Sequence, residues 1–157
     1  MTELSAKAAQ ELAAQSARAK IMEIQRQCQG LPDEHRMDET PPVKNWLAPG
    51  IYCREIHLPG DSLVVGRIHR HDHMNIISKG CVTVYTEFGE ETLTAPASFI
   101  SKAGTKRVVW THDDAIWTTI HPNPDDEQSI DALEQRYTAA EYAELGMSVG
   151  ELLEETV

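Results

Sequence analysis

The chain has 157 residues, a formal net charge of −11 and three widely separated cysteines. This length fits one domain with additional segments and allows a proper core. The acidic excess argues against nucleic acid and anionic membranes as partners, and no apolar run approaches the length of a membrane span. An odd number of cysteines without a CxxC pair favours a reduced, cytoplasmic setting.

Residues 1–30 predict an N-terminal helical arm. Strong helix formers fill this segment, Thr2 is a suitable N-cap, and Gly30 is a suitable stop. The apolar stripe is thin and rich in alanine, so two interpretations stay open: a surface that packs on a partner helix or a barrel edge, or a soluble, frayed arm. Residues 31–50 carry four prolines and several charges, which predicts an ordered but irregular lead-in.

Residues 51–122 have the pattern of a β-barrel. Short runs of β-branched and aromatic residues alternate with turn sequences, which is typical of a sandwich or a closed barrel. About eight strands are expected, over residues 51–57, 62–69, 74–78, 81–87, 91–94, 97–101, 107–110 and 115–121. Residues 123–157 form an acidic segment, in which helices are expected over 125–137, over 138–146 and after Ser148.

The segment 69–73 carries the strongest chemical signal. Three of the chain's seven histidines, His69, His71 and His73, occupy alternate positions in it. Side chains alternate faces along a strand, so the three imidazoles project to one side and converge if the strand bends. Imidazole binds transition metals, and three protein ligands with an open position are the arrangement of catalytic zinc sites. The alternative is a solvated strand end.

Two further residues are candidates for the same site. His121 ends an expected strand; if its face points into the barrel it supplies a fourth metal ligand, and otherwise it is a strand-end histidine beside Pro122. The guanidinium of Arg107 can bind a carboxylate or a phosphate, or Arg107 can be an outward strand residue paired with an acid.

The spacing of these residues resembles the first motif of the cupin superfamily, His-x-His followed by Glu and Gly. Aligned on Gly80, the motif places His73 at the glutamate position and His69 at one of the two histidines. The other histidine position falls on Arg67 or, with a shortened loop, on His71.

The second cupin motif is reduced to one glycine, Gly104, and Arg107 stands where the family has its metal-binding histidine. A guanidinium stays protonated and cannot donate a lone pair to a metal. Over roughly residues 47–145 the chain is similar to small single-domain cupins of bacteriophages and prophages. The resemblance implies a mainly β fold: a cupin-type double-stranded β-helix (jelly-roll barrel) with an N-terminal helix and C-terminal helices.

We therefore expect a metal-binding cupin, of the phage or prophage type, that binds or modifies a small molecule in its barrel. A divalent transition metal (Fe, Zn, Ni or Mn) is expected on His69, His71, His73 and His121, with Arg107 as a further binding residue. The alternative is a non-catalytic structural or assembly protein of a phage particle or its host interface, with the barrel as scaffold and the N-terminal helix for docking. Whether the protein is an enzyme stays open.

The chain is also expected to form a homo-oligomer, because barrels of this type resemble cupins that dimerise through sheet edges and the N-terminal helix adds contact area. Neither nucleic acid nor a membrane is expected as a partner. The expected location is cytoplasmic, or virion-associated if the protein is phage-encoded.

Overall fold

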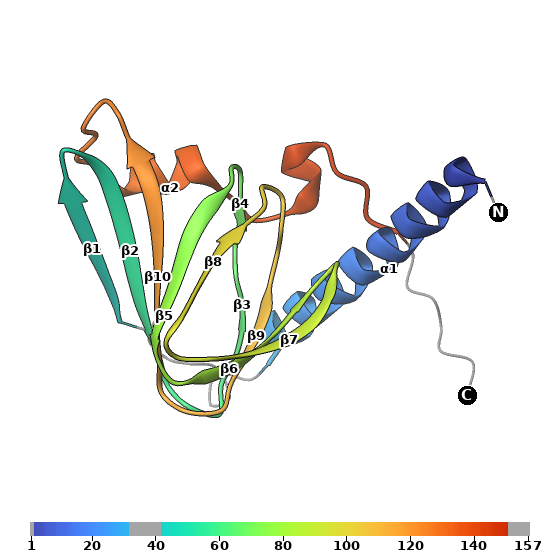
Figure 1. Cartoon of the computed structure of the whole chain (residues 1–157), viewed down its shortest axis with the longest axis horizontal. Coiled ribbons are helices and arrows are strands. Elements are labelled where there is room, and N and C mark those ends of the chain that lie inside the picture. The colour runs from blue at the N-terminus through green and yellow to red at the C-terminus, as the bar shows by residue number, and fades with distance from the viewer. Residues whose placement is uncertain (1, 32–41, 151–157) are drawn as a thin grey trace.

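The structure, a computed structural model, describes residues 2–31 and 42–150, and its barrel is built from two antiparallel sheets (Figure 1). One sheet has the strand order β1-β2-β10-β5-β8 and the other the order β3-β9-β6-β7, while β4 pairs with β11. The strands are β1 (Val43–Ala48), β2 (Gly50–Leu58), β3 (Leu63–Val65), β4 (Ile68–His69), β5 (His73–Lys79), β6 (Cys81–Thr86), β7 (Gly89–Thr94), β8 (Ala97–Ser101), β9 (Val108–Thr111), β10 (Ala115–Asn123) and β11 (Thr138–Ala139). This mainly β architecture with flanking helices confirms the predicted fold class.

The main core fills one end of the space between the sheets. Strand alternation places apolar side chains of both sheets face to face, because every second residue points inward. Its buried members are Leu58, Ile77, Val82, Val84, Val109, Ala115 and Trp117. Burying each large side chain contributes about 1.5–3 kcal/mol. The other end of the same space is lined by polar side chains and holds the site described below.

The N-terminal helix α1 (Glu3–Gln29) begins and ends where its caps predict. Thr2 accepts a hydrogen bond from the Ser5 backbone at 3.3 Å, and the Gly30 N–H donates to the Arg26 carbonyl at 2.9 Å. Residues 14–25 of the helix, except the exposed Lys20, are half-buried or buried, whereas residues 2–13 are exposed and project away from the barrel (Figure 1). The second half of α1 therefore packs on the barrel, as the first interpretation of this segment holds.

An ion pair between Arg18 and Glu87 fixes α1 to the barrel. The Nε of Arg18 donates to Glu87 Oε2 at 2.7 Å, and its Nη2 lies 2.6 Å from the same oxygen. Another Arg18 nitrogen donates to the Ser148 carbonyl at 3.0 Å. Both side chains of the Arg18–Glu87 pair are nearly inaccessible to solvent. This single contact joins α1, the end of β6 and the C-terminal segment.

Some expected boundaries are wrong. The lead-in 31–50 is not irregular throughout, because residues 43–48 form β1, which pairs along its whole length with β2. The expected strand 62–69 is divided into β3 and β4 by Gly66 and Arg67. Residues 32–41 of the lead-in lie outside the described residues.

The C-terminal segment covers one mouth of the barrel. Its helix α2 (Ile130–Tyr137) is capped by Ser129, which accepts from the Ala132 N–H at 3.3 Å, and it buries Leu133 and Tyr137 against Tyr52 of β2.

The expected second helix is shorter than predicted, because the chain first forms β11 and then a 3-10 helix, η2 (Tyr142–Leu145), which ends at Gly146. The Gly146 φ of 67° is left-handed, a conformation that favours glycine. Residues 151–157, where most of the helix after Ser148 was expected, lie outside the described residues. Across residues 2–31 and 42–150, no helix combines the length and the apolar character needed to cross a bilayer.

Candidate functional site

Four histidines, from three strands and one bend, meet in the barrel at the mouth covered by α2. His69 lies in β4, His73 begins β5, and His121 lies near the end of β10. His71 lies in a bend between β4 and β5, so the segment is not one continuous strand. The bend brings together all four histidines that the sequence nominates as metal ligands.

Hydrogen bonds from distant parts of the chain hold this bend. The Arg70 N–H donates to the Tyr137 carbonyl at 2.8 Å, which ties the bend to the end of α2. On the other side, Asp72 accepts from the Ala103 N–H at 2.9 Å and from Lys102 Nζ at 3.0 Å. The position of the histidines therefore depends on contacts that are not local in the sequence.

The imidazole rings are in direct contact. His69 and His73 are stacked, with ring centroids 3.9 Å apart and 18° between the planes. His121 lies 5.1 Å from His69 and 5.4 Å from His73 by centroid. The Nδ1 of His121 and the Nε2 of His71 are 3.1 Å apart, so one nitrogen donates and the other accepts. Neutral rings are required for such an arrangement, since protonated rings would repel each other.

Burial keeps these rings neutral. Desolvation is the main cause that lowers the pKa of His69 to about 2, of His121 to about 3 and of His73 to about 4, and the neighbouring positive groups lower each value further. The pKa of His71 is lowered as well, also by burial. Because metals bind the neutral form of imidazole, all four rings are in the ligating form near pH 7.

The donor set suits a transition metal, although the rings are not arranged around one point. His69 Nδ1 and His73 Nε2 are buried and have no hydrogen-bond partner, which is unusual for buried polar atoms and leaves two lone pairs or N–H groups unused. Within the described residues, however, no group of three or more His, Cys, Asp or Glu side chains is placed so that it could hold a metal ion.

The stacking of two rings explains this difference. The lone pair of an imidazole lies in the plane of the ring, so the lone pairs of the stacked rings of His69 and His73 lie in two nearly parallel planes that do not meet at a common point near both rings. A common metal at about 2.0–2.1 Å from each nitrogen requires one ring to rotate. The contact between His71 and His121 must also open, because it occupies a nitrogen of each ring.

A cavity of about 280 Å³ extends from the histidines toward the core. Three of the four histidines line it, and His71 does not, although it touches His121 from outside. Apolar side chains, including Val109 and Trp117, form much of the wall, and Arg107 lies in it. A mostly apolar cavity with a few polar groups is typical of a small-molecule site.

Arg107 belongs to the interior, so the outward interpretation of this residue is wrong. Its Nη2 donates to Ser101 Oγ, and its guanidinium lies 5.9 Å from the ring centroids of both Phe99 and Trp117. Ser101 Oγ also accepts from Asn75 Nδ2 at 2.6 Å, and Asn75 Oδ1 accepts from Trp117 Nε1 at 2.9 Å. A continuous hydrogen-bond network therefore positions the guanidinium.

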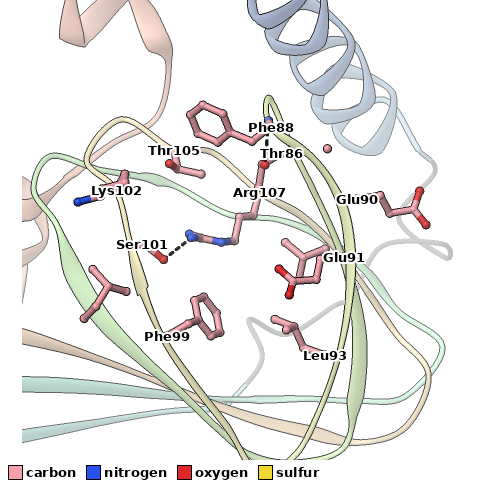
Figure 2. A pocket seen from close by; sticks show the side chains of 13 residues that line it. Thr86, Phe88, Glu90, Glu91, Leu93, Phe99, Ser101, Lys102, Thr105 and Arg107 are labelled. Atoms are coloured by element: carbon pink, nitrogen blue, oxygen red, sulfur yellow. Dashed lines mark hydrogen bonds between the residues drawn. The ribbon is translucent and has the colours of Figure 1, made fainter.

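A second cavity, of about 410 Å³, lies beside Arg107 at the seam between β7 and β8. These two strands are the ends of different sheets and do not pair with each other. Figure 2 shows the guanidinium between β8, which carries Ser101, and β7, which carries Glu91 and Leu93. Arg107 lines both cavities and thus stands between the seam and the barrel interior.

Sequence reasoning missed several residues of the site. Tyr137 lies parallel to His121 at 5.2 Å and also contacts His71 at 4.5 Å. Asn75 and Ser101 are fully or almost fully buried polar residues of the cavity network. Asn75 carried a usable signal, because it is in phase with His73 and Ile77 on one strand. Tyr137 carried none, since its contact depends on where α2 docks.

No family model matches the chain, and no curated protein matches its sequence. Solved structures do resemble it. KdgF from Halomonas sp. has 17% identity, a TM-score of 0.44, and coverage of 61% of this chain and 95% of that chain. A cupin-2 domain containing protein from Shewanella frigidimarina has 12% identity, a TM-score of 0.43, and coverage of 62% and 98%.

The EutQ protein of Clostridium difficile is similar at 11% identity, with a TM-score of 0.47 and coverage of 60% of this chain and 76% of that chain. These likenesses are remote. They concern the fold, which is a jelly-roll barrel in this chain, and do not extend to activity or ligands.

Proposed function

We propose that this chain is a metal-binding protein of the cupin type, related to those of phages and prophages, that holds a small molecule in its barrel. One observation carries the proposal: four neutral imidazoles, of which His73 and His121 are buried and His69 and His71 half-buried, gather at one end of a cavity. Stabilisation of the fold does not explain these histidines, because a buried nitrogen without a hydrogen-bond partner costs about 1–3 kcal/mol of folding free energy.

The residues proposed to hold the metal are His69, His73 and His121, with His71 as a fourth ligand or as a hydrogen-bond partner of His121. The first two have unused nitrogens, and the third lies between them and His71. Nitrogen donors of this kind favour Fe, Zn or Ni, and Mn is the least suited of the four expected metals. When bound, such an ion supplies Lewis-acid chemistry or an activated water.

The chain's own residues supply the surroundings of that site. α2 covers the mouth and Tyr137 contacts two of the rings, which limits the access of water. The apolar wall selects a ligand with an apolar body.

Metal analysis of the purified protein tests the proposal. The wild type, stripped with a chelator and dialysed against Fe(II), Zn(II), Ni(II) or Mn(II), is expected to retain about one equivalent of at least one metal. His69→Ala and His73→Ala should retain little, because each removes a buried donor. His112→Ala is the matched control, since His112 is exposed and bonded to Thr83 on the far side of the barrel wall. A wild type that binds none of the four metals would overturn the proposal.

A second function, assembly, is favoured by the first half of α1. Residues 2–13 project from the barrel, and Leu4 and Leu12 on them are 79% and 67% exposed. In this view the barrel is a scaffold and the projecting segment docks on a partner. Deleting residues 2–13 should then abolish partner binding while leaving metal content unchanged. Unchanged solution mass and unchanged partner binding after the deletion would reject it.

A further inference from the structure

Arg107 is a half-buried cation without an acidic partner. Within residues 2–31 and 42–150, no carboxylate oxygen lies within 4.0 Å of its nitrogens, and its side chain makes one hydrogen bond, to the neutral Ser101. By contrast, the guanidinium of Arg18, which is nearly inaccessible to solvent, has Glu87 as a partner at 2.6 Å. Buried charges in proteins are normally paired, because desolvating an unpaired ion is costly.

The guanidinium nevertheless carries its charge. Burial lowers the pKa of Arg107 to about 10, which leaves the group protonated near pH 7. The net charge of −11 repels anions at long range, so binding of an anion depends on local positive charge. Of the three arginines that line the cavity, Arg54 lies 3.6 Å from Glu134 and Arg67 donates to Thr138, so Arg107 is the one available to an anion in the interior. The stacking of Arg107 near Phe99 and Trp117 supplies partial compensation, since aromatic faces attract cations.

The remaining donors of Arg107 are available to a ligand. A guanidinium has five N–H groups, and the hydrogen bonds of the described residues use only Nη2. The network from Trp117 through Asn75 to Ser101 fixes the orientation of that nitrogen. A donor group that is oriented before the ligand arrives loses little entropy on binding.

We propose that Arg107 is an anion subsite that receives the carboxylate of a small ligand whose apolar body lies in the barrel cavity, between Arg107 and the histidines. The inference rests on the proposed function in so far as the barrel is the ligand site, and it adds the ligand's chemical class. It does not require that the metal be present.

Two properties of the site select a carboxylate, and a third limits the size of the ligand. A planar carboxylate matches the fork of a guanidinium with two parallel hydrogen bonds. Arg107 supplies one positive charge, which neutralises a carboxylate but leaves excess charge on a phosphate dianion in a largely apolar cavity. The cavity volume of about 280 Å³ lies at the lower end of the range of small-molecule pockets, so the ligand is small.

The seam between β7 and β8 gives a ligand a second route to the Arg107 guanidinium. Arg107 and Ser101 line the seam cavity as well as taking part in the interior network. Because α2 covers the mouth of the barrel, the open seam gives an anion access to Arg107 without displacement of that helix.

Fluorescence of Trp117 tests the subsite in metal-free protein. Trp46 and Trp110 are about half exposed, so Trp46→Phe and Trp110→Phe leave Trp117 as the sole indole, in contact with the cavity. This background protein is titrated with benzoate, acetate, inorganic phosphate and, as the uncharged analogue of benzoate, benzyl alcohol. We expect a saturable signal with benzoate, a weaker one with acetate and none with benzyl alcohol.

Substitutions at Arg107 test whether benzoate binds to its guanidinium. Arg107→Gln should weaken benzoate binding about 10-fold to 100-fold, the loss of a charge-assisted hydrogen bond, and Arg107→Lys should keep part of the affinity because it keeps the charge but not the fork. Arg26→Gln is the control: it removes the same charge from an exposed position on α1. If Arg107→Gln does not fold, Arg107→Lys and Ser101→Ala, which removes the orienting acceptor, carry the test.

The outcomes separate this inference from the metal proposal. Equal benzoate affinity in Arg107→Gln, binding of phosphate without any carboxylate, or no saturable binding in the wild type would overturn the subsite. A protein that binds benzoate through Arg107 but no metal would support the subsite while the metal proposal fails. Conversely, a wild type that binds metal but whose benzoate affinity is the same in Arg107→Gln would support the metal proposal while the subsite fails.

Discussion

The ring of Tyr137 lies parallel to that of His121, with centroids 5.2 Å apart and 9° between the planes, and its hydroxyl donates to the Pro122 carbonyl. One side chain at the end of α2 thus contacts a candidate ligand and closes a hydrogen bond to the same strand, β10. The helix that follows the barrel is therefore part of the site.

Truncation of Tyr137 should destabilise the protein and open the mouth of the barrel. We expect Tyr137→Ala to reduce the free energy of unfolding by about 3–5 kcal/mol, as for other buried aromatic residues, and Tyr137→Phe by about 1 kcal/mol through the lost hydrogen bond. Urea denaturation measures both. Phe88→Ala is the control, because Phe88 is 76% exposed. Equal effects of the two alanine variants would show that Tyr137 is not packed as described.

Acid should destabilise the protein through the buried histidines. Their pKa values in the folded state, about 4 for His73, 3 for His121 and 2 for His69, lie below the value of about 6.5 in the unfolded chain. As the pH falls below about 6.5, the unfolded state takes up protons that the folded state does not, so the free energy of unfolding decreases. The slope is up to about 1.4 kcal/mol per pH unit for each histidine, and it persists down to about pH 4 for all three.

Chemical denaturation at a series of pH values between 7 and 4 measures this slope. His121→Gln should reduce it by about one proton's contribution, about 1.4 kcal/mol per pH unit, whereas His112→Gln on the surface should leave it unchanged. A stability that is constant between pH 6.5 and 4 would contradict the burial of neutral rings.

Much of the barrel could be predicted from the sequence because local sequence patterns indicate its strands. Turn residues and β-branched runs locate β5 to β8, and the phase of His69 and His73 indicates a common face. The bend that holds His71 could not be predicted, because it depends on the Tyr137 carbonyl and the Ala103 N–H, which are remote in the sequence. β1 was missed for a different reason: the prolines that precede and follow it suggested a loop.

The direction of the Arg107 side chain also could not be predicted from the sequence. Residue 107 precedes β9 rather than lying in it, so strand alternation does not determine where its side chain points. Only the network through Ser101 and Asn75 directs it inward. The spacing of the second cupin motif aligned Arg107 with the position of the metal-binding histidine. The orientation of its side chain depends on tertiary hydrogen bonds.

The buried pair Arg18–Glu87 should fix α1 to the barrel. Glu87→Gln leaves the Arg18 guanidinium buried with a neutral partner, and we expect a loss of about 2–3 kcal/mol, below the ~3–5 kcal/mol typical of breaking a buried pair, because Arg18 keeps its contact with the Ser148 carbonyl. Faster proteolysis of residues 14–29 should accompany the loss. Glu90→Gln, on the exposed start of β7, is the control. Unchanged proteolysis would show that α1 is held by other contacts.

The outer face of the five-stranded sheet should mediate self-association with a second copy of the chain. Directly paired residues share a face, and one row crosses all five strands with an apolar or thiol side chain at every position. The row consists of Trp46, Cys53, Ile120, Met74 and Ile100. Trp46 and Ile100 at its two ends are 56% and 58% exposed. Five strands about 4.8 Å apart and up to about 30 Å long give a face of about 600–700 Å², close to the ~800 Å² per partner of stable interfaces.

We therefore expect the wild type to sediment at twice the mass of one chain, and Trp46→Lys with Ile100→Lys to sediment as a monomer, because two like charges on each copy would meet across the two-fold axis. Leu4→Lys with Leu12→Lys is the matched control, since it places the same charges on exposed apolar positions of α1 and leaves the sheet intact. If the α1 variant dissociates and the sheet variant does not, the copies associate through the helix; if the wild type is a monomer at all concentrations, the sheet face does not bind a second copy.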